Sequence, residues 1–327
     1  MELVPLGPDF GAEVRGVALV DVASSDAAYQ AVRAAFEEHS LLLFRDQETT
    51  DDVQAAFSRA FGPLERVKIG SEGVGTFYNR LHNLAPDGAL APETSRQALT
   101  ARANQLWHTD SSFKRTPALA SVLSARVAPQ NGGETEFAST RQAWTRLSPA
   151  MQSRLRGAVV THAYAHSRDQ IDPGLATGPE RAALPPVKWR MVWPNPVNGR
   201  FALYIASHAY AIEGLGDEEA RALLDELIAD ATRPEHTYQH RWRQGDVLMW
   251  DNRATMHRGR PWPHDQARSM VRTTISAVEA DGLAEVRPFS PLESAKKSGE
   301  SRSERRSATR QTRGQGASLP LRISSRP

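Results

Sequence analysis

Two segments that are far apart in the sequence carry the side chains best suited to chemistry. The first, residues 104–113 (NQLWHTDSSF), contains His108 and Asp110, and an extended segment would point these alternate side chains to the same side. The second, residues 245–259, supplies His257 just after an expected strand. Two imidazoles and one carboxylate can bind one metal ion and leave three coordination positions open, which suits non-haem Fe(II) and oxygen chemistry.

Two arginines strengthen this prediction, because a His-x-Asp pair alone is frequent by chance and could reflect only a hydrogen-bonded histidine near a turn. Arg268 and Arg272 follow His257, and on a strand their even spacing places them on one face, roughly 13 Å apart at about 3.3 Å per residue. The planar guanidinium binds a carboxylate in bidentate fashion. The arginines therefore predict carboxylate ligands on either side of a metal; the alternative is that both are solvated charges of a strand.

The composition excludes several other classes of site. The 327 residues include no cysteine, which excludes a disulfide framework, a thiolate zinc site, an iron–sulfur cluster and a cysteine nucleophile. No apolar run is long enough to span a bilayer, the first residues lack the basic and hydrophobic regions of a signal peptide, and no glycine-rich phosphate-binding motif is present. With 40% hydrophobic and 24% charged residues, we expect a cytoplasmic globular protein without a membrane partner.

Charge is distributed unevenly between the body of the chain and its end. Residues 288–327 hold nine Lys/Arg and three Asp/Glu, a net charge of +6, so residues 1–287 carry −4. The end is rich in serine and arginine and poor in large apolar residues, which predicts a basic disordered tail behind a single domain of residues 1–287. Such a tail could contact nucleic acid or anionic lipid. We favour an inert extension, since the body has no basic stripe and no aromatic–basic RNA motif.

The order of the predicted elements indicates strands surrounded by helices. Apolar residues at helical spacing predict helices, and runs of β-branched and aromatic residues between turn signals predict strands. The predicted helices cover residues 24–39, 50–61, 148–157 and 216–231, and the predicted strands cover residues 41–44, 159–166, 201–206, 237–243, 247–251 and 270–278. Pro/Gly-rich stretches at 83–96 and 172–200 are expected to be loops. The expected fold is mainly β with flanking helices (α+β), with a β-sandwich or jelly-roll core.

Several longer segments together resemble one known family. These segments are NQLWHTDSSF, GGETEF, HRWRQGD, MWDNR and HRGR, and the resemblance covers about residues 10–280. The chain resembles the TauD/TfdA family of Fe(II)- and 2-oxoglutarate-dependent dioxygenases, and within it the TfdA branch that acts on 2,4-dichlorophenoxyacetate. The resemblance implies a double-stranded β-helix (jelly-roll or cupin-like) core.

The resemblance also implies a role for each residue that matches the family's motifs. Fe(II) would be bound by His108, Asp110 and His257. Arg268 and the Thr135 hydroxyl would bind the distal carboxylate of 2-oxoglutarate, which is a co-substrate together with O₂. Arg272 would bind the acid group of the substrate, helped by groups near Asn104.

The implied reaction is oxidation of a small anionic molecule. In the TfdA branch this is an aryloxyalkanoate: hydroxylation beside the ether oxygen gives a hemiacetal that collapses to a phenol and glyoxylate, while 2-oxoglutarate gives succinate and CO₂. Two alternatives stay open, namely the same chemistry on another carboxylate or a sulfonate such as taurine, and a non-catalytic binding protein on the same fold. The complete set of His, Asp and Arg residues argues against the last. Family analogy suggests a homo-oligomer.

Four further side chains have both a functional and an ordinary interpretation. His208 is a candidate pocket histidine. Lys68 could bind the substrate carboxylate, although a surface lysine is the more common case. His162 and His166, four residues apart in an expected strand, could bind a second metal, although histidines at the edge of the core are favoured. The stiff stretch 261–263 (PWP) is expected to shape the mouth of the pocket.

Overall fold

The computed structural model describes residues 1–85 and 88–288. Within this part, Met1–Arg287 form one unit of β-sheets covered by helices. The predicted disordered tail lies outside the described residues from residue 289 onward. No helix among the described residues is long and apolar enough to cross a membrane.

Side-chain caps define the helices of the N-terminal region. α1 (Leu19–Ser24) and α2 (Asp26–His39) are separated at Ser25, whose side chain accepts a hydrogen bond from the backbone N–H of Ala28. α3 (Asp51–Phe61) begins after Thr50, which caps it in the same way. The prediction of a helix over residues 24–39 is therefore wrong at its start: Ser24 ends α1, and Ser25 is the cap of α2.

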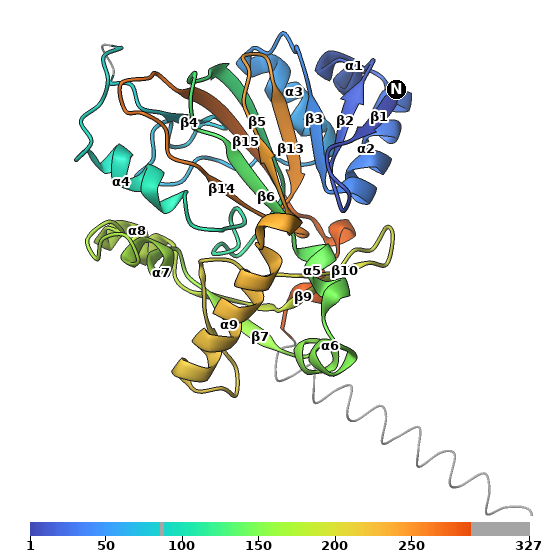
Figure 1. The fold of residues 1–327 in the computed structure, drawn as a ribbon, viewed down its shortest axis with the longest axis vertical. Helices are drawn as coiled ribbons and strands as arrows, with labels where there is room; N and C mark the ends of the chain where they lie inside the picture. The colour runs from blue at the N-terminus through green and yellow to red at the C-terminus, as the bar shows by residue number, and fades with distance from the viewer. Residues whose placement is uncertain (86–87, 289–327) are drawn as a thin grey trace, which may run out of the picture. The chain divides into compact units, whose positions relative to one another are not determined.

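The largest sheet contains seven strands and lies against these three helices (Figure 1). In spatial order its strands are β1 (Glu2–Pro5), β2 (Ala12–Arg15), β3 (Leu41–Phe44), β13 (Val247–Asp251), β5 (Ala118–Val127), β15 (Ser269–Ser276) and β4 (Asn79–His82). The pair β2–β3 is parallel, and the other neighbouring pairs are antiparallel.

Alternating side chains give this sheet two apolar faces. In β13, Val247 and Met249 pack on the side of α1–α3, whereas Leu248 and Trp250 belong to a second apolar cluster on the other side. Burial of both faces explains why β3 reads as a continuous apolar run, LLLF, instead of an alternating one.

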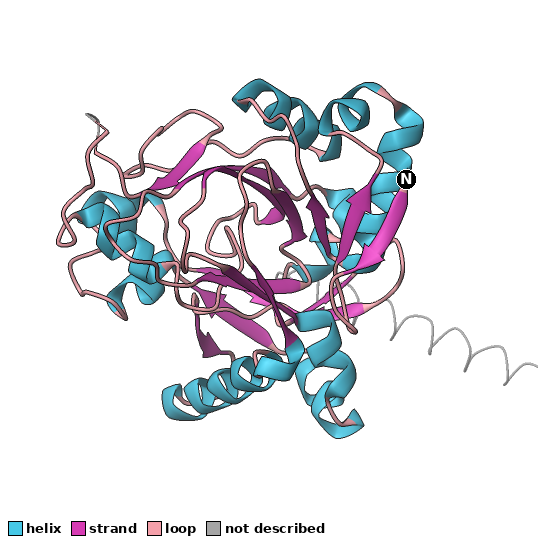
Figure 2. Cartoon of the chain, turned by 45° about the horizontal axis from the view of Figure 1, so that its top comes forward, coloured by secondary structure: helices cyan, strands magenta, loops and turns pink. Residues whose placement is uncertain are grey.

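A smaller sheet faces the second side of the large one. Its strands are β12 (Thr237–His240), β6 (Thr135–Ser139) and β14 (Thr255–Gly259). The ring of Phe137 in β6 lies 5.4 Å from that of Trp250 in β13, which joins the two sheets through their apolar faces. Figure 2 shows the strands in two layers with the helices on the outside.

The remaining elements complete the unit. In one further sheet, β7 (Val159–His162) lies between β11 (Ala209–Ile212) and β8 (Val187–Arg190), and in another β10 (Phe201–Leu203) pairs with β9 (Val192–Pro194). The other helical segments are α4 (Arg96–Ala103), α5 (Thr140–Arg146), α6 (Pro149–Leu155), α7 (Tyr164–Asp169), α8 (Gly178–Ala183), α9 (Asp217–Ala231), η1 (Pro234–His236), η2 (Glu279–Asp281) and α10 (Leu283–Val286).

Two predictions fail between residues 159 and 200. The strand expected over 159–166 ends at His162, and α7 begins at Tyr164. The loop expected over 172–200 contains α8, β8 and β9. α8 is initiated by a capping box in which Thr177 and Glu180 satisfy each other's backbone N–H groups. β8 and β9 exist through pairing with β7 and β10, which local propensity does not reveal.

Candidate active site

Backbone pairing brings the two predicted metal-binding segments together. The N–H of His108 donates to the carbonyl of His257 at 2.9 Å, and the N–H of His257 donates back at 2.8 Å. Asp110 follows His108 on the same side, so that one ligand atom from each of the three residues lies within 4.8 Å of the others. Among residues 1–85 and 88–288, this is the one group of three or more His, Cys, Asp or Glu side chains with such geometry.

The protonation states of the three side chains fit a divalent metal ion. Burial lowers the pKa of His108 and of His257, so both imidazoles are neutral near pH 7. Burial alone would raise the pKa of Asp110, but the charge of Arg272 and a hydrogen bond from Ser121 hold it well below its ordinary value. Neutral imidazoles and an ionised carboxylate are the forms that bind metals.

Hydrogen bonding also orients one imidazole. His108 Nδ1 lies 2.8 Å from the carbonyl oxygen of Leu106 and must carry the proton of that bond, which leaves Nε2 as the ligand atom. The ring of Trp250 lies 4.6 Å from that of His257 and keeps this side of the site apolar. The residues present therefore fit a bound metal, and a His-Asp-His facial set favours Fe(II) among the common divalent ions.

Two residues that did not stand out in the sequence hold Asp110 in place. Ser121 Oγ donates to Asp110 Oδ2 at 2.7 Å and accepts from Asn252 Nδ2 at 3.1 Å. Asn252 Oδ1 accepts from the backbone N–H of Asp110 at 3.0 Å and from Trp250 Nε1 at 3.1 Å. Asn252 thus links the turn between β13 and β14 to the segment that carries the first two ligands.

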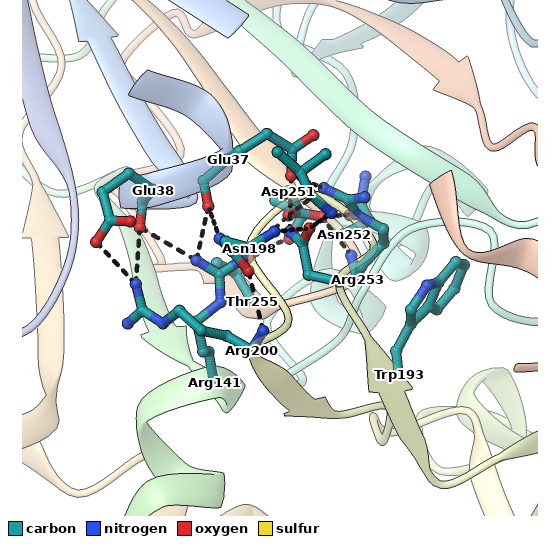
Figure 3. A network of polar contacts seen from close by, with 12 residues as sticks. Glu37, Glu38, Arg141, Trp193, Asn198, Arg200, Asp251, Asn252, Arg253 and Thr255 are labelled. Atoms are coloured by element: carbon teal, nitrogen blue, oxygen red, sulfur yellow. Dashed lines mark hydrogen bonds and ion pairs between the residues drawn. The ribbon is translucent and has the colours of Figure 1, made fainter. Parts of the chain in front are cut away.

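A buried network of charged side chains connects the turn between β13 and β14 to α2 (Figure 3). Arg253 donates to both oxygens of Asp251 at 2.9 Å and to Glu37 Oε2 at 2.7 Å, and Arg141 donates to the Glu37 carbonyl at 2.9 Å. Burial opposes the charge of Arg253, but Asp251 and Glu37 outweigh it and raise its pKa. Since removal of one member of a buried ion pair is costly, α2 holds the turn firmly.

A cavity of about 360 Å³ surrounds the side chains of His108, Asp110 and His257, a volume in the range of small-molecule sites. It is lined by all seven residues predicted from the sequence as site residues, namely Asn104, His108, Asp110, Thr135, His257, Arg268 and Arg272. The side chain of Trp262, from the PWP stretch, also lines it. Residues far apart in the chain, from Glu65 to Thr274, therefore line one cavity.

Arg268 is a buried cation without a carboxylate partner in the described part of the chain. It lies just before β15, with its guanidinium carbon 5.0 Å from the centre of the Trp262 ring, and its Nε has no hydrogen-bond partner. Burial lowers the pKa of Arg268 to about 10, which leaves it charged at neutral pH. Gly133, with φ of +70°, makes room for it: an added Cβ would lie 3.3 Å from Arg268 Cδ and Nε. Such a site calls for an anionic ligand.

The other predicted ligand contacts have partners within the protein. Thr135 Oγ1 accepts from Trp242 Nε1 at 3.0 Å, which leaves its own hydroxyl proton available. Arg272 Nη1 donates to Asp110 Oδ1 at 2.6 Å, while Arg272 Nε has no partner. Asn104 lies at the end of α4, and its carbonyl accepts from the N–H of Gly259 at 2.9 Å.

The surroundings of the three histidines and the lysine decide between the interpretations given above. His208 is buried in the cavity wall, and neither of its ring nitrogens has a partner. Lys68 also lines the cavity and donates to Glu180 Oε1 at 2.9 Å, so the favoured surface position is wrong. His162 is buried beside Ser112, and His166 lies on α7, so they form no second metal site.

Comparison with known proteins agrees with this geometry. A His-Asp-His triad beside buried arginines is typical of non-haem metal oxygenases. The family model described as "Taurine catabolism dioxygenase TauD, TfdA family" matches residues 2–274. The chain belongs to the TauD/TfdA family, as its motifs predicted.

Three relatives illustrate the similarity. The chain is 39% identical over 275 residues to the alpha-ketoglutarate-dependent 2,4-dichlorophenoxyacetate dioxygenase of Cupriavidus pinatubonensis, covering 83% of this chain and 96% of the relative. It is 34% identical to the (S)-phenoxypropionate/alpha-ketoglutarate-dioxygenase of Sphingobium herbicidovorans, covering 86% and 97%. The crystal structure of AAD-2 in complex with Mn(II) and N-oxalylglycine superposes with a TM-score of 0.79 at 36% identity, covering 86% and 99%.

Proposed function

We propose that this protein is an Fe(II)- and 2-oxoglutarate-dependent dioxygenase that hydroxylates an aryloxyalkanoate of the 2,4-dichlorophenoxyacetate type. The products are a phenol and glyoxylate from the substrate, with succinate and CO₂ from 2-oxoglutarate. The observation that carries this proposal is the buried His108–Asp110–His257 triad in one cavity with the unneutralised Arg268. The similarity to the 2,4-dichlorophenoxyacetate enzyme over most of both chains supports the substrate class.

Each predicted site residue has a defined task in this proposal. The triad holds Fe(II), which when bound supplies the activation of O₂ and the oxidative decarboxylation of 2-oxoglutarate. Arg268 binds the distal carboxylate of 2-oxoglutarate, and Thr135 donates its free hydroxyl proton to the same group. Arg272, with its Nε–H, and Asn104 contact the substrate near the metal.

The remaining protein groups hold the reactants and exclude water. The Trp250 ring packs against the ring of His257. The Ser121 hydroxyl donates a hydrogen bond to Asp110, which stabilises the ionised form of the carboxylate. The cavity walls place the substrate carbon next to the ether oxygen close to the metal, which is the main contribution of the protein to rate. After hydroxylation, the hemiacetal loses its hydroxyl proton and breaks the bond between the hydroxylated carbon and the ether oxygen. The ether oxygen takes up a proton and leaves as the phenol, and the carbon becomes the carbonyl of glyoxylate.

The proposal includes a fold and an organisation for the whole chain. The seven-stranded sheet and the β12–β6–β14 sheet are proposed as the two halves of a double-stranded β-helix, supported by their opposed apolar faces. Residues 1–287 are the catalytic domain, and the basic tail 288–327 is not needed for catalysis. A homo-oligomeric state, a cytoplasmic location and the lack of membrane and nucleic-acid partners stay predictions from the sequence.

Succinate formation from 2-oxoglutarate tests the proposal. The protein is supplied with Fe(II), ascorbate and O₂, and assayed with 2,4-dichlorophenoxyacetate, with taurine and without a second substrate. Strong stimulation by the phenoxyacetate, with release of the phenol, is the expected result. Stimulation by taurine alone would move the substrate to the sulfonates, and no succinate from iron-loaded protein would favour a non-catalytic binding protein.

A further inference from the structure

The cations around the cavity differ in whether a carboxylate neutralises them. Six of the lysines and arginines that line it have an acidic partner: Lys68 and Arg96 share Glu180, and Arg80, Lys114, Arg260 and Arg272 pair with Asp51, Glu65, Glu136 and Asp110. In the described part of the chain, Arg168 and Arg268 line the same cavity without one. Two unneutralised guanidiniums match two carboxylate-bearing ligands.

Arg168 is a buried charged side chain without an ion pair in the described part of the chain. It lies on α7, next to α4 and α8 (Figure 1), and only 8% of its surface is exposed. Its Nη1 donates to Ser167 Oγ at 3.1 Å, its Nε has no partner, and its guanidinium carbon lies 4.7 Å from the centre of the Tyr164 ring. One hydroxyl and one aromatic face do not offset the cost of a buried charge, so an anion at this place would be strongly favoured.

Arg168 and Arg268 have different neighbours. Arg168 lines the cavity together with His108 and His208, whose ring centres lie 6.2 Å apart, and it packs on Tyr164. Arg268 comes from the start of β15 and lies against Gly133 and Trp262. The two cations therefore serve separate positions, one beside the first metal ligand and one beside the entry to β6.

The surroundings of Arg168 are suited to an aromatic acid. The Phe113 ring lies 5.2 Å from Tyr164 and 4.7 Å from His208, and neither nitrogen of His208 is satisfied. Tyr164 is held in place, since its hydroxyl donates to Glu180 at 3.2 Å and Lys68 Nζ lies 4.5 Å from its ring centre. A carboxylate at Arg168 would thus lie next to rigid aromatic walls that can pack against an aryl ring.

We propose that Arg168 is the principal cation that binds the carboxylate of the aromatic acid substrate, at a position separate from the 2-oxoglutarate site at Arg268. This inference rests on the proposed function. Arg272, whose Nη1 donates to Asp110, contacts the same substrate through its Nε–H, which has no partner in the protein. The bidentate geometry of the guanidinium fixes the direction in which the carbon next to the ether oxygen faces the metal.

Kinetics of Arg168→Gln and Arg168→Lys test the proposal. Loss of a charge-assisted contact of about 1.5–3 kcal/mol should raise the KM for 2,4-dichlorophenoxyacetate about 10- to 150-fold in the Gln variant. The Lys variant should recover part of this loss, since it keeps the charge but not the fork. The KM for 2-oxoglutarate should change less than about threefold in both. The matched control is Arg181→Gln, on the neighbouring helix α8, whose exposed guanidinium pairs with Asp169; it should behave as the wild type.

Binding measurements keep the test valid if turnover is weak. Calorimetric titration of 2,4-dichlorophenoxyacetate into the Mn(II)- and N-oxalylglycine-loaded wild type and Arg168→Gln should give the same ratio of affinities as the KM values. The wild type should also bind the acid much more tightly than its neutral amide. An increase in the KM for 2-oxoglutarate alone would assign Arg168 to that ligand, and unchanged binding of the acid would overturn the proposal. Failure of the proposed function would differ, since the wild type itself would then form no succinate.

Discussion

Replacement of Ser121 by alanine should weaken metal binding while the protein stays folded. The Ser121 hydroxyl donates to Asp110 Oδ2 at 2.7 Å and accepts from Asn252 Nδ2 at 3.1 Å. The substitution removes a hydrogen bond to an ionised carboxylate, which contributes about 1.5–3 kcal/mol, and leaves the Asn252 amide without this acceptor. Since about 1.4 kcal/mol is a factor of ten, the dissociation constant of the metal should rise about 10- to 150-fold.

Ser124→Ala is the matched control for this experiment. Ser124 lies on the same strand and is equally buried, but its hydroxyl donates to Gln54 Oε1 at 2.7 Å and not to a metal ligand. Metal affinity can be measured by titration with Mn(II), followed by the loss of the free-ion paramagnetic resonance signal. Both variants should lose about 1–2 kcal/mol of unfolding free energy, and only Ser121→Ala should lose affinity. An equal loss of affinity in both variants, or none in either, would refute the reasoning.

Other changes test the remaining parts of the account. Asp110→Ala and His257→Ala should each abolish 2-oxoglutarate turnover without changing the circular dichroism spectrum, and wild-type succinate from either would contradict the triad. Deletion of residues 288–327 should leave turnover unchanged, and a large loss would give the tail a role. Asp246→Asn should be less stable than the wild type at pH 7. Burial alone would raise the pKa of Asp246, but the hydrogen bond from His240 helps to lower it below its ordinary value. Its contribution to stability is therefore complete above about pH 4 and is lost as the pH falls through the lowered pKa. In urea unfolding the difference between the two proteins should narrow below about pH 4, and a constant difference would contradict this assignment.

The sequence predicted those parts of the fold that local signals determine. The bounds of β3 and β13 agree with the structure, because a short apolar run between turn residues has few other conformations. α9 begins one residue after the predicted start, where three acidic residues suit the helix dipole. β8 and β14 were not predicted, since each depends on a partner strand far away in the chain. β9 was not predicted either, because this three-residue strand lies within a Pro/Gly-rich stretch and pairs with the equally short β10.

The site shows the same division. His108, Asp110 and His257 could be found in the sequence because ligand type and spacing carry the signal. Ser121 and Asn252 could not, because a buried serine and a turn asparagine have many ordinary uses, and only their contacts to Asp110 distinguish them. The sequence could not single out Arg168 for a different reason. Arg168 differs from the other cations of the cavity by the lack of an acidic partner, and this is visible only in the three-dimensional structure.

The most direct test of the central claim is the origin of the oxygen atoms in the products. The iron-loaded protein is supplied with 2-oxoglutarate and 2,4-dichlorophenoxyacetate under isotopically labelled O₂, and the succinate and phenol are quantified by mass spectrometry. A coupled dioxygenase should form equal amounts of succinate and phenol, and each succinate should carry one labelled oxygen atom. Phenol without succinate, or succinate without the label, would contradict the account.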